Sequence, residues 1–157
     1  YGLDCAVLVP ANLYGPEDHF EEEKSHVIPA IIRRYVEAKD AGLESVSNWG
    51  TGSPTREFLH VADAAEAIAI AAEKDVDCVP INLGTGIETS IAELTELIAS
   101  TVGYEGEVEW DTSKPDGQPK RYLDVSRCKE LLGFEAKISL EDGIRETVEW
   151  YRANPVT

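Results

Sequence analysis

The sequence predicts an α/β protein in which parallel strands alternate with helices. Residues 4–10 and 79–83 form short, continuous apolar runs, as expected of strands buried on both faces of a parallel sheet. Between and after these runs, apolar residues recur at the three- and four-residue spacing of amphipathic helices, for example from Val27 to Val36. Such alternation of strands with helices is typical of parallel α/β architectures.

The expected helices begin and end at recognisable signals. Pro29 is tolerated only in the first turn of the first helix, which Gly42 ends. Asp63 is expected to be the N-cap of an Ala-rich helix, and Ser90 opens the next one with a capping box. Ser139 caps the last helix. Helices are therefore expected at residues 27–41, 64–74, 91–102, 126–132 and 140–154.

The remaining segments are short strands and turns. Residues 107–110 alternate like a strand with one face in water. Gly and Pro residues indicate turns, because they adopt backbone conformations that strands and helices do not. Further strands are thus expected at residues 45–49 and 57–61, and turns at 12–16, 50–54 and 84–86.

Composition excludes several classes of protein. Fourteen basic and thirty acidic residues among 157 give a net charge of −16, which argues against a nucleic-acid partner, although a few local cations can still bind a small anion. No apolar run approaches the ~20 residues that span a bilayer, so no membrane partner is expected. Cys5, Cys78 and Cys128 are scattered and odd in number. We therefore expect neither a disulfide framework nor a metal site, but reduced thiols in a cytoplasm, with Cys5 as a small core residue.

Two features indicate that these residues are part of a longer protein. The chain contains no Met, so Tyr1 is not expected to be its natural start. No strand is followed by the Gly-rich loop that binds a dinucleotide, and the segment from Gly84 to Gly86 is too short to replace it.

Three blocks together resemble one superfamily. They are residues 10–16 (PANLYGP), residues 56–61 (REFLHV) followed by Asp63, and residues 82–86 (NLGTG). In this order they are similar to the extended short-chain dehydrogenases/reductases, which include nucleotide-sugar epimerases, dehydratases and reductases. The resemblance implies the C-terminal part of a doubly wound, NAD(P)-binding Rossmann fold, whose last strands interleave with a smaller α/β substrate domain over residues 1–157. In that superfamily the first block follows the catalytic Tyr-x-x-x-Lys pair, so the resemblance implies that this pair precedes the present residues.

Longer strings resemble the GDP-L-fucose synthase family within this superfamily. They are residues 25–30 (SHVIPA) with Arg33 and Arg34, and residues 113–121 (SKPDGQPKR) with 123–127 (LDVSR). The resemblance implies a cytoplasmic homodimer that uses NADP(H) to convert GDP-4-keto-6-deoxy-D-mannose into GDP-L-fucose by 3,5-epimerisation and 4-reduction. These residues alone are then expected to be inactive. Ala11 stands where the family usually has Thr.

His26 is the candidate catalytic residue. A histidine has an unperturbed pKa of ~6.5, which suits the transfer of protons next to a ketone. A histidine before a helix can also simply cap it or hydrogen-bond a loop. The resemblance makes His26 the family's active-site histidine, partnered by a cysteine outside this chain. It also assigns Pro10, Ala11, Asn12, Leu13 and His26 to the cofactor side.

The candidate substrate residues are mainly cations, because a diphosphate requires fixed positive charges, preferably Arg. By resemblance these residues are Arg34, Trp49, Arg56, Asp116, Lys120 and Arg121. Each has a purely structural alternative: a surface ion pair for the cations, core packing for Trp49, and an ordinary turn for Asp116. His19 is expected to be exposed and His60 structural.

Two other functions remain open from the sequence. One is a different nucleotide-sugar epimerase or dehydratase of the same superfamily. The other is a non-catalytic member that binds a nucleotide as a sensor or scaffold.

Overall fold

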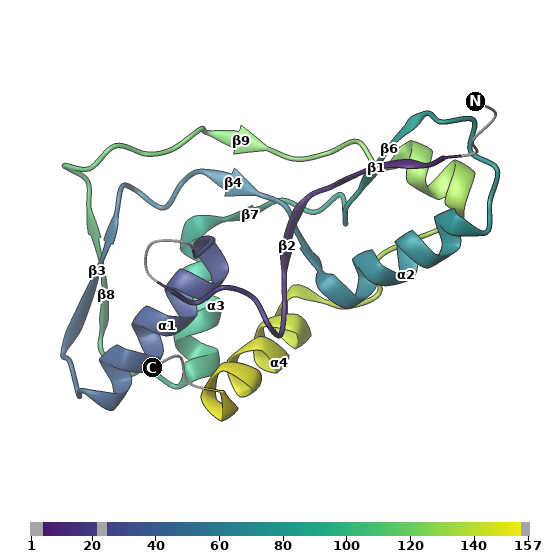
Figure 1. Ribbon diagram of the computed structural model, residues 1–157. Helices are drawn as coiled ribbons and strands as arrows, with labels where there is room; N and C mark the ends of the chain where they lie inside the picture. Colours follow the sequence, from purple (N-terminus) through teal and green to yellow (C-terminus); the bar gives the residue numbers. More distant parts are fainter. Residues whose placement is uncertain (1–4, 22–24, 155–157) are drawn as a thin grey trace.

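A computed structural model of the chain describes residues 5–21 and 25–154. Its helical segments are α1 (Val27–Asp40), α2 (Val61–Ala72), α3 (Ile91–Val102), the π-helical η1 (Cys128–Leu132) and α4 (Leu140–Ala153) (Figure 1). Its strands are β1 (Val7–Pro10), β2 (Asn12–Tyr14), β3 (Ser45–Trp49), β4 (Thr55–Arg56), β5 (Phe58–His60), β6 (Pro80–Leu83), β7 (Thr89–Ser90), β8 (Glu107–Asp111) and β9 (Lys120–Arg121). No helix of the described part is long and apolar enough to cross a bilayer.

The strand pairings are predominantly parallel, which confirms the predicted fold class. β1 pairs with β6, β2 with β5, β3 with β8 and β4 with β9, all in parallel, whereas β4 and β7 are antiparallel. The β1–β6 and β3–β8 pairs lie at opposite ends of the molecule, and β4, β7 and β9 run between them (Figure 1). The predicted substrate residues Arg56, Lys120 and Arg121 belong to β4 and β9 and therefore lie between the two ends.

Two apolar clusters form the core. In the first, α3 lies between α1 and α4, and buries Leu94 and Ile98 against Ile32, Tyr35 and Ile144. The second cluster packs α2 and η1 against β1 and β6. The apolar residues of each helix recur at three- and four-residue spacing, so each helix presents one buried face. Burial of each large apolar side chain stabilises the fold by roughly 1.5–3 kcal/mol.

The predicted turn at residues 12–16 is wrong in its first half, because Asn12–Tyr14 forms β2. The backbone of β2 pairs with β5, and the Asn12 amide donates a hydrogen bond to the Glu57 carbonyl at 2.8 Å. The turn begins only at Gly15, whose φ is +151°. A Cβ at this position would lie 2.6 Å from Val61 Cγ1, so only glycine fits.

The predicted N-cap of the Ala-rich helix is also wrong. α2 begins at Val61, and its N-cap is His60, whose Nδ1 accepts a hydrogen bond from the Ala62 N–H at 3.3 Å. Asp63 is buried instead, and one of its oxygens accepts the N–H groups of Lys137 and Ile138 at 3.1 and 3.0 Å. Sequence spacing could not reveal this partner, which lies more than seventy residues away.

Other local predictions are confirmed. Ser90 and Glu93 form the predicted capping box of α3, and the Ser139 hydroxyl caps α4. The helix expected at residues 126–132 is present, but its last five residues are π-helical. The apolar run 4–10 is not buried on both faces in the described part, since Val7 and Val9 are 42% and 41% exposed. Cys5 is exposed too, so its prediction as a core residue is wrong.

Candidate functional site

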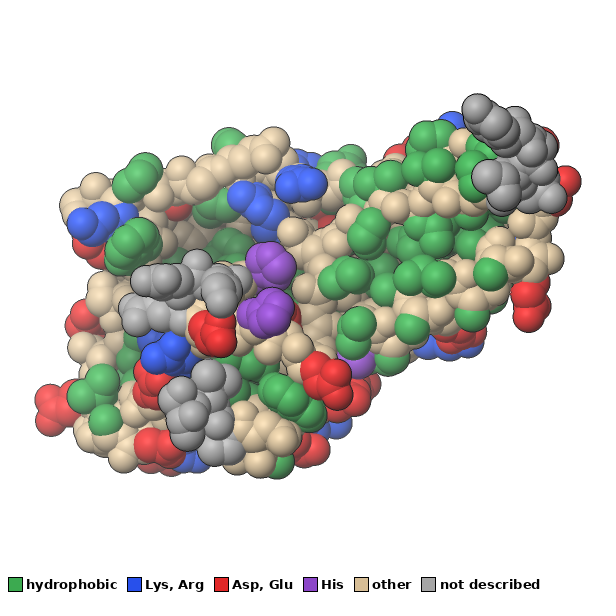
Figure 2. All heavy atoms as spheres, viewed as in Figure 1, with side chains coloured by type: hydrophobic (Ala, Val, Ile, Leu, Met, Phe, Trp, Pro, Cys, Tyr) green, Lys and Arg blue, Asp and Glu red, His purple; other side chains and the backbone are tan. Residues whose placement is uncertain are grey.

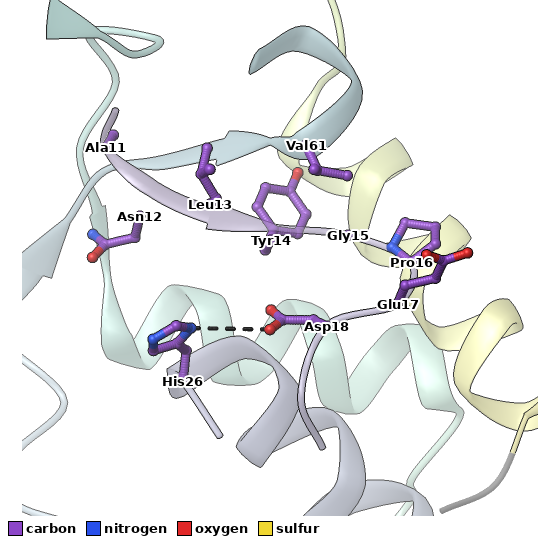
Figure 3. A pocket seen from close by; sticks show the side chains of 10 residues that line it. All are labelled: Ala11, Asn12, Leu13, Tyr14, Gly15, Pro16, Glu17, Asp18, His26 and Val61. Carbon is purple, nitrogen blue, oxygen red and sulfur yellow. Dashed lines mark ion pairs between the residues drawn. The ribbon is translucent and has the colours of Figure 1, made fainter. Parts of the chain in front are cut away.

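A pocket of about 530 Å³ lies at the carboxyl end of β1, where the chain turns into β2 (Figure 3). Side chains of β2, of the turn that follows it and of the first residue of α2 line the pocket, and His26 closes it from the start of α1. Ligands of open α/β sheets bind at this end of the strands. The lining residues are Ala11, Asn12, Leu13, Tyr14, Gly15, Pro16, Glu17, Asp18, His26 and Val61.

His26 is positioned by α1 but does not cap it. It occupies the N-cap position with extended backbone angles, and its side chain makes no capping hydrogen bond. The side chain is 75% exposed, and the ring points toward the pocket (Figure 3). The helix-capping alternative for His26 is therefore wrong, and the imidazole is available to a ligand.

Asp18 lies behind the imidazole. Its Oδ1 is 3.9 Å from Nδ1 of His26 and accepts the His19 N–H at 2.7 Å. The Asp18 side chain is only 14% exposed, and within the described residues its buried Oδ2 accepts no hydrogen bond. This carboxylate can orient the imidazole ring and stabilise it when it carries a proton.

A second pocket, of about 290 Å³, adjoins the first. Asn12, Leu13 and His26 line both pockets, and Arg56 and Phe58 line only the second. The structure thus brings the predicted cofactor-side residues 11–13 and the predicted substrate residue Arg56 around one histidine.

Arg56 and Arg121 lie opposite each other on β4 and β9. The Arg56 Nη1 donates to the carbonyls of Thr55 and Gln118, both at 2.7 Å, which fixes the guanidinium. Among the described residues neither arginine pairs with a carboxylate, although like charges on neighbouring strands repel each other. Basic side chains gather beside histidines at the centre of the face in Figure 2, next to a hollow. An anion bound there would relieve the repulsion.

Glu57 organises this region and was not predicted from the sequence. It is 1% exposed, and its two carboxylate oxygens accept the N–H groups of Gly86 at 2.7 Å and of Leu123 at 2.8 Å. A side chain at Gly84 would collide with the carboxylate, so glycine is required there. The only signal in the sequence is a charged residue within an otherwise apolar strand segment.

Lys120 and Asp116 are engaged within the chain. Lys120 Nζ lies 2.6 Å from Glu88 Oε1, and this hydrogen bond raises the pKa of Lys120 and lowers that of Glu88. The Asp116 carboxylate accepts the N–H and the hydroxyl of Thr51, both at 2.8 Å, and so holds the turn after β3. The geometry therefore gives both residues structural partners.

The other predicted residues lie away from His26. Trp49 is 74% exposed, which excludes the core-packing alternative, and Lys114 Nζ lies 5.7 Å from the centre of its ring. Arg34 lines a separate pocket and donates to Asn48 at 3.1 Å. Pro10 is exposed at the end of β1 and lines neither central pocket. His60 is buried and structural, and His19 is exposed, as expected.

No group of three or more His, Cys, Asp and Glu residues in the described part of the chain is arranged to hold a metal ion. The fold and the pocket at the carboxyl ends of its parallel strands define a Rossmann-like α/β protein. Residues 1–84 match the NAD dependent epimerase/dehydratase family. Because this match covers more than half of the 157 residues, the chain belongs to that family.

The most similar proteins support the resemblance noted in the sequence. GDP-L-fucose synthase 1 of Arabidopsis thaliana is 47% identical over 154 residues, which are 98% of this chain and 47% of that protein. A GDP-L-fucose synthetase of Naegleria fowleri bound to NADP superposes with a TM-score of 0.86 at 31% identity, over 95% of this chain and 47% of that one. UDP-glucose 4-epimerase of Thermotoga maritima superposes with a TM-score of 0.85 at 33% identity, over 98% and 47%. The chain spans about half the length of the curated relatives it matches.

Proposed function

We propose that the whole protein is a GDP-L-fucose synthase, which uses NADP(H) to convert GDP-4-keto-6-deoxy-D-mannose into GDP-L-fucose. The observation that carries the proposal is the position of His26, which lines both central pockets and is not used as a helix cap. The similarity of nearly the whole chain to GDP-L-fucose synthases supports this choice among nucleotide-sugar enzymes. By resemblance, a Tyr-x-x-x-Lys pair and a cysteine outside these residues complete the site.

The first pocket fits the nicotinamide end of the cofactor. It has room for a planar ring, and the β1–β2 connection at Ala11–Leu13 would lie along it at the carboxyl end of a parallel strand. When bound, NADPH supplies the hydride that reduces the C4 ketone. Ala11 suits this place even where the family usually has Thr, since the backbone of the segment can make the contact. Pro10 is exposed outside the pocket, so it would only fix the backbone at the start of this segment and would not contact the ring.

His26 would move the protons of the epimerisation. Inversion at C3 and C5 requires a base that removes a proton next to the ketone and an acid that returns one on the other face. The exposed imidazole can do either, depending on its protonation state. Asp18, 3.9 Å behind it, would stabilise the imidazolium that forms when His26 takes a proton.

The substrate diphosphate would lie near Arg56 and Arg121, whose opposed guanidiniums have no carboxylate partner among the described residues. Trp49, Arg34, Lys120 and Asp116 remain proposed contacts for the more distant parts of the nucleotide. The exposed ring of Trp49 is suited to stack on guanine. To contact the nucleotide, Lys120 would have to leave Glu88 or bind both, and Asp116 would have to do the same with Thr51.

The test is proton exchange in the full-length protein. In deuterated water with GDP-4-keto-6-deoxy-D-mannose and NADPH, the wild type should incorporate deuterium at C3 and C5 and form GDP-L-fucose. His26→Gln should lose both incorporations by at least ~100-fold, the usual contribution of a general acid–base, while still binding NADPH. The matched control is His19→Gln, which changes an exposed histidine outside both pockets.

Two outcomes would contradict the proposal. Normal deuterium entry in His26→Gln would refute the role of the histidine. Tighter binding and turnover of UDP or dTDP sugars than of the GDP sugar would instead assign the protein to another activity of the superfamily, such as that of the similar UDP-glucose 4-epimerase.

The proposal also covers the domain organisation, the oligomeric state and the location of the enzyme. Residues 1–157 would contribute the last strands of the cofactor-binding sheet and most of the substrate domain. The second apolar cluster would be the core of the first part, and the first apolar cluster that of the substrate domain. We further propose a cytoplasmic homodimer that acts on a free GDP-sugar and requires neither a membrane nor a nucleic acid. Analytical ultracentrifugation of the full-length protein would test the dimer, and a species with the mass of one chain at working concentration would contradict it.

A further inference from the structure

Two cysteines that are 73 residues apart in the sequence meet at the surface. Cys5 lies two residues before β1 and Cys78 two residues before β6, and their sulfur atoms are 2.8 Å apart. Both side chains are exposed. The third cysteine, Cys128, is buried in the second apolar cluster.

The pairing of β1 with β6 brings the segments that contain the two cysteines together. In the parallel β1–β6 pair, Val7 lies opposite Pro80 and Leu8 opposite Ile81. Cys5 and Cys78 each lie two residues before these strands, so the pairing brings the two preceding segments together, although Cys78 itself is in a turn with a φ of +56°.

The contact between the sulfur atoms suits a covalent bond. The paired strands that follow the two cysteines lie ~4.7–4.9 Å apart, and disulfide-bonded cysteines have Cα atoms ~4.4–6.8 Å apart. The observed contact of 2.8 Å between the sulfurs is shorter than two unbonded sulfur atoms normally keep, and a small movement would bring them to bonding distance.

The cysteine pair is separate from the proposed active site. It lies at the amino-terminal ends of β1 and β6, whereas the pocket around His26 lies beyond their carboxyl ends. Together with Lys74, Asp75 and Asp77, the two cysteines line an open cavity of about 400 Å³, so a small reagent can reach the sulfur atoms.

We propose that Cys5 and Cys78 are a modification site, which a low-molecular-weight disulfide converts into a reversible Cys5–Cys78 disulfide. The thiolate of one cysteine attacks the reagent and releases one thiol, and the second thiolate then attacks the mixed disulfide and releases the other thiol. Two protein thiols are oxidised, and one small disulfide is reduced to two thiols. The bond would join the amino-terminal ends of β1 and β6 without changing the site around His26.

The experiment uses the full-length protein in folded form. It is equilibrated with mixtures of reduced and oxidised glutathione, its thiols are alkylated, and its peptides are mapped by mass spectrometry. We expect a linked peptide that joins Cys5 to Cys78, lighter by two hydrogen atoms than the two peptides together and reversible by reduced glutathione. Enzyme turnover should be unchanged between the oxidised and reduced forms.

Variants distinguish this pair from general thiol oxidation. Cys5→Ser and Cys78→Ser should each abolish the linked peptide and leave a glutathione adduct on the remaining cysteine. The matched control Cys128→Ala should form it as the wild type does. Separate glutathione adducts on Cys5 and Cys78 in the wild type at every ratio, with no linked peptide, would overturn the proposal, as would a linkage to Cys128. This result does not depend on how well any variant folds, because it comes from the wild-type protein.

Discussion

Replacing Glu57 should destabilise the protein more than replacing any surface carboxylate. Its two oxygens accept one backbone N–H from the 84–86 loop and one from the segment after β9, and the side chain is 1% exposed. Glu57→Ala leaves both N–H groups without a partner. Hydrogen bonds to a charged group contribute ~1.5–3 kcal/mol each, so the loss should be about 3–6 kcal/mol. This is a large fraction of the ~5–15 kcal/mol that stabilises a typical domain.

Urea unfolding of the full-length protein, followed by tryptophan fluorescence, would measure this loss. Glu57→Gln keeps one acceptor and should lose about half as much as Glu57→Ala. The control is Glu88→Gln, which removes a partly exposed ion pair with Lys120, keeps an amide oxygen that can accept the Thr55 hydroxyl, and should change the midpoint little. A Glu57→Ala midpoint equal to that of the Glu88→Gln control would refute the reasoning, since it would mean that water replaces the carboxylate without cost.

Three further predictions concern the ligand site and the core. Arg121→Ala should weaken the binding of GDP in isothermal titration by roughly 10- to 100-fold, as the loss of a charge-assisted hydrogen bond predicts, whereas the exposed control Arg145→Ala should not. Trp49→Ala should weaken GDP binding by about 1 kcal/mol, the contribution of one aromatic stack, with no loss of stability; an altered urea midpoint and an unchanged Kd would contradict this. Burial raises the pKa of Tyr14, so the folded form keeps a proton that the unfolded form releases above pH ~10. The free energy of unfolding should therefore fall as the pH rises through that value, and Tyr14→Phe should reduce the fall; an equal fall in Tyr14→Phe would exclude Tyr14 as its source.

The sequence predicted those features that depend on neighbouring residues. The capping box, the Ser139 cap, the helix stops and the apolar spacing act within one or two turns, so α1, α3 and α4 could be placed nearly correctly. The place of His26 at the start of α1 followed in the same way, from Pro29 in the first turn.

Features that depend on distant residues could not be predicted in this way. The residues of β2 have turn-forming composition, yet they form a strand because β5 pairs with them. Asp63 has the character of an N-cap but bonds to the 137–138 backbone, and Glu57 bonds to the 84–86 loop and to the segment after β9. The meeting of Cys5 and Cys78 depends on the β1–β6 register, which no local pattern contains.

His26 illustrates how the two kinds of information combine. An N-cap is usually Ser, Thr, Asp or Asn, and such a side chain in place of one that makes no cap would stabilise the helix by about 1 kcal/mol. α1 lacks this stabilisation, because the His26 ring turns toward Asp18 and the pocket instead. Departures from a local rule are expected where function sets the residue type. The missing cap therefore supports the proposal that a ligand, and not the helix, determines the residue at this position.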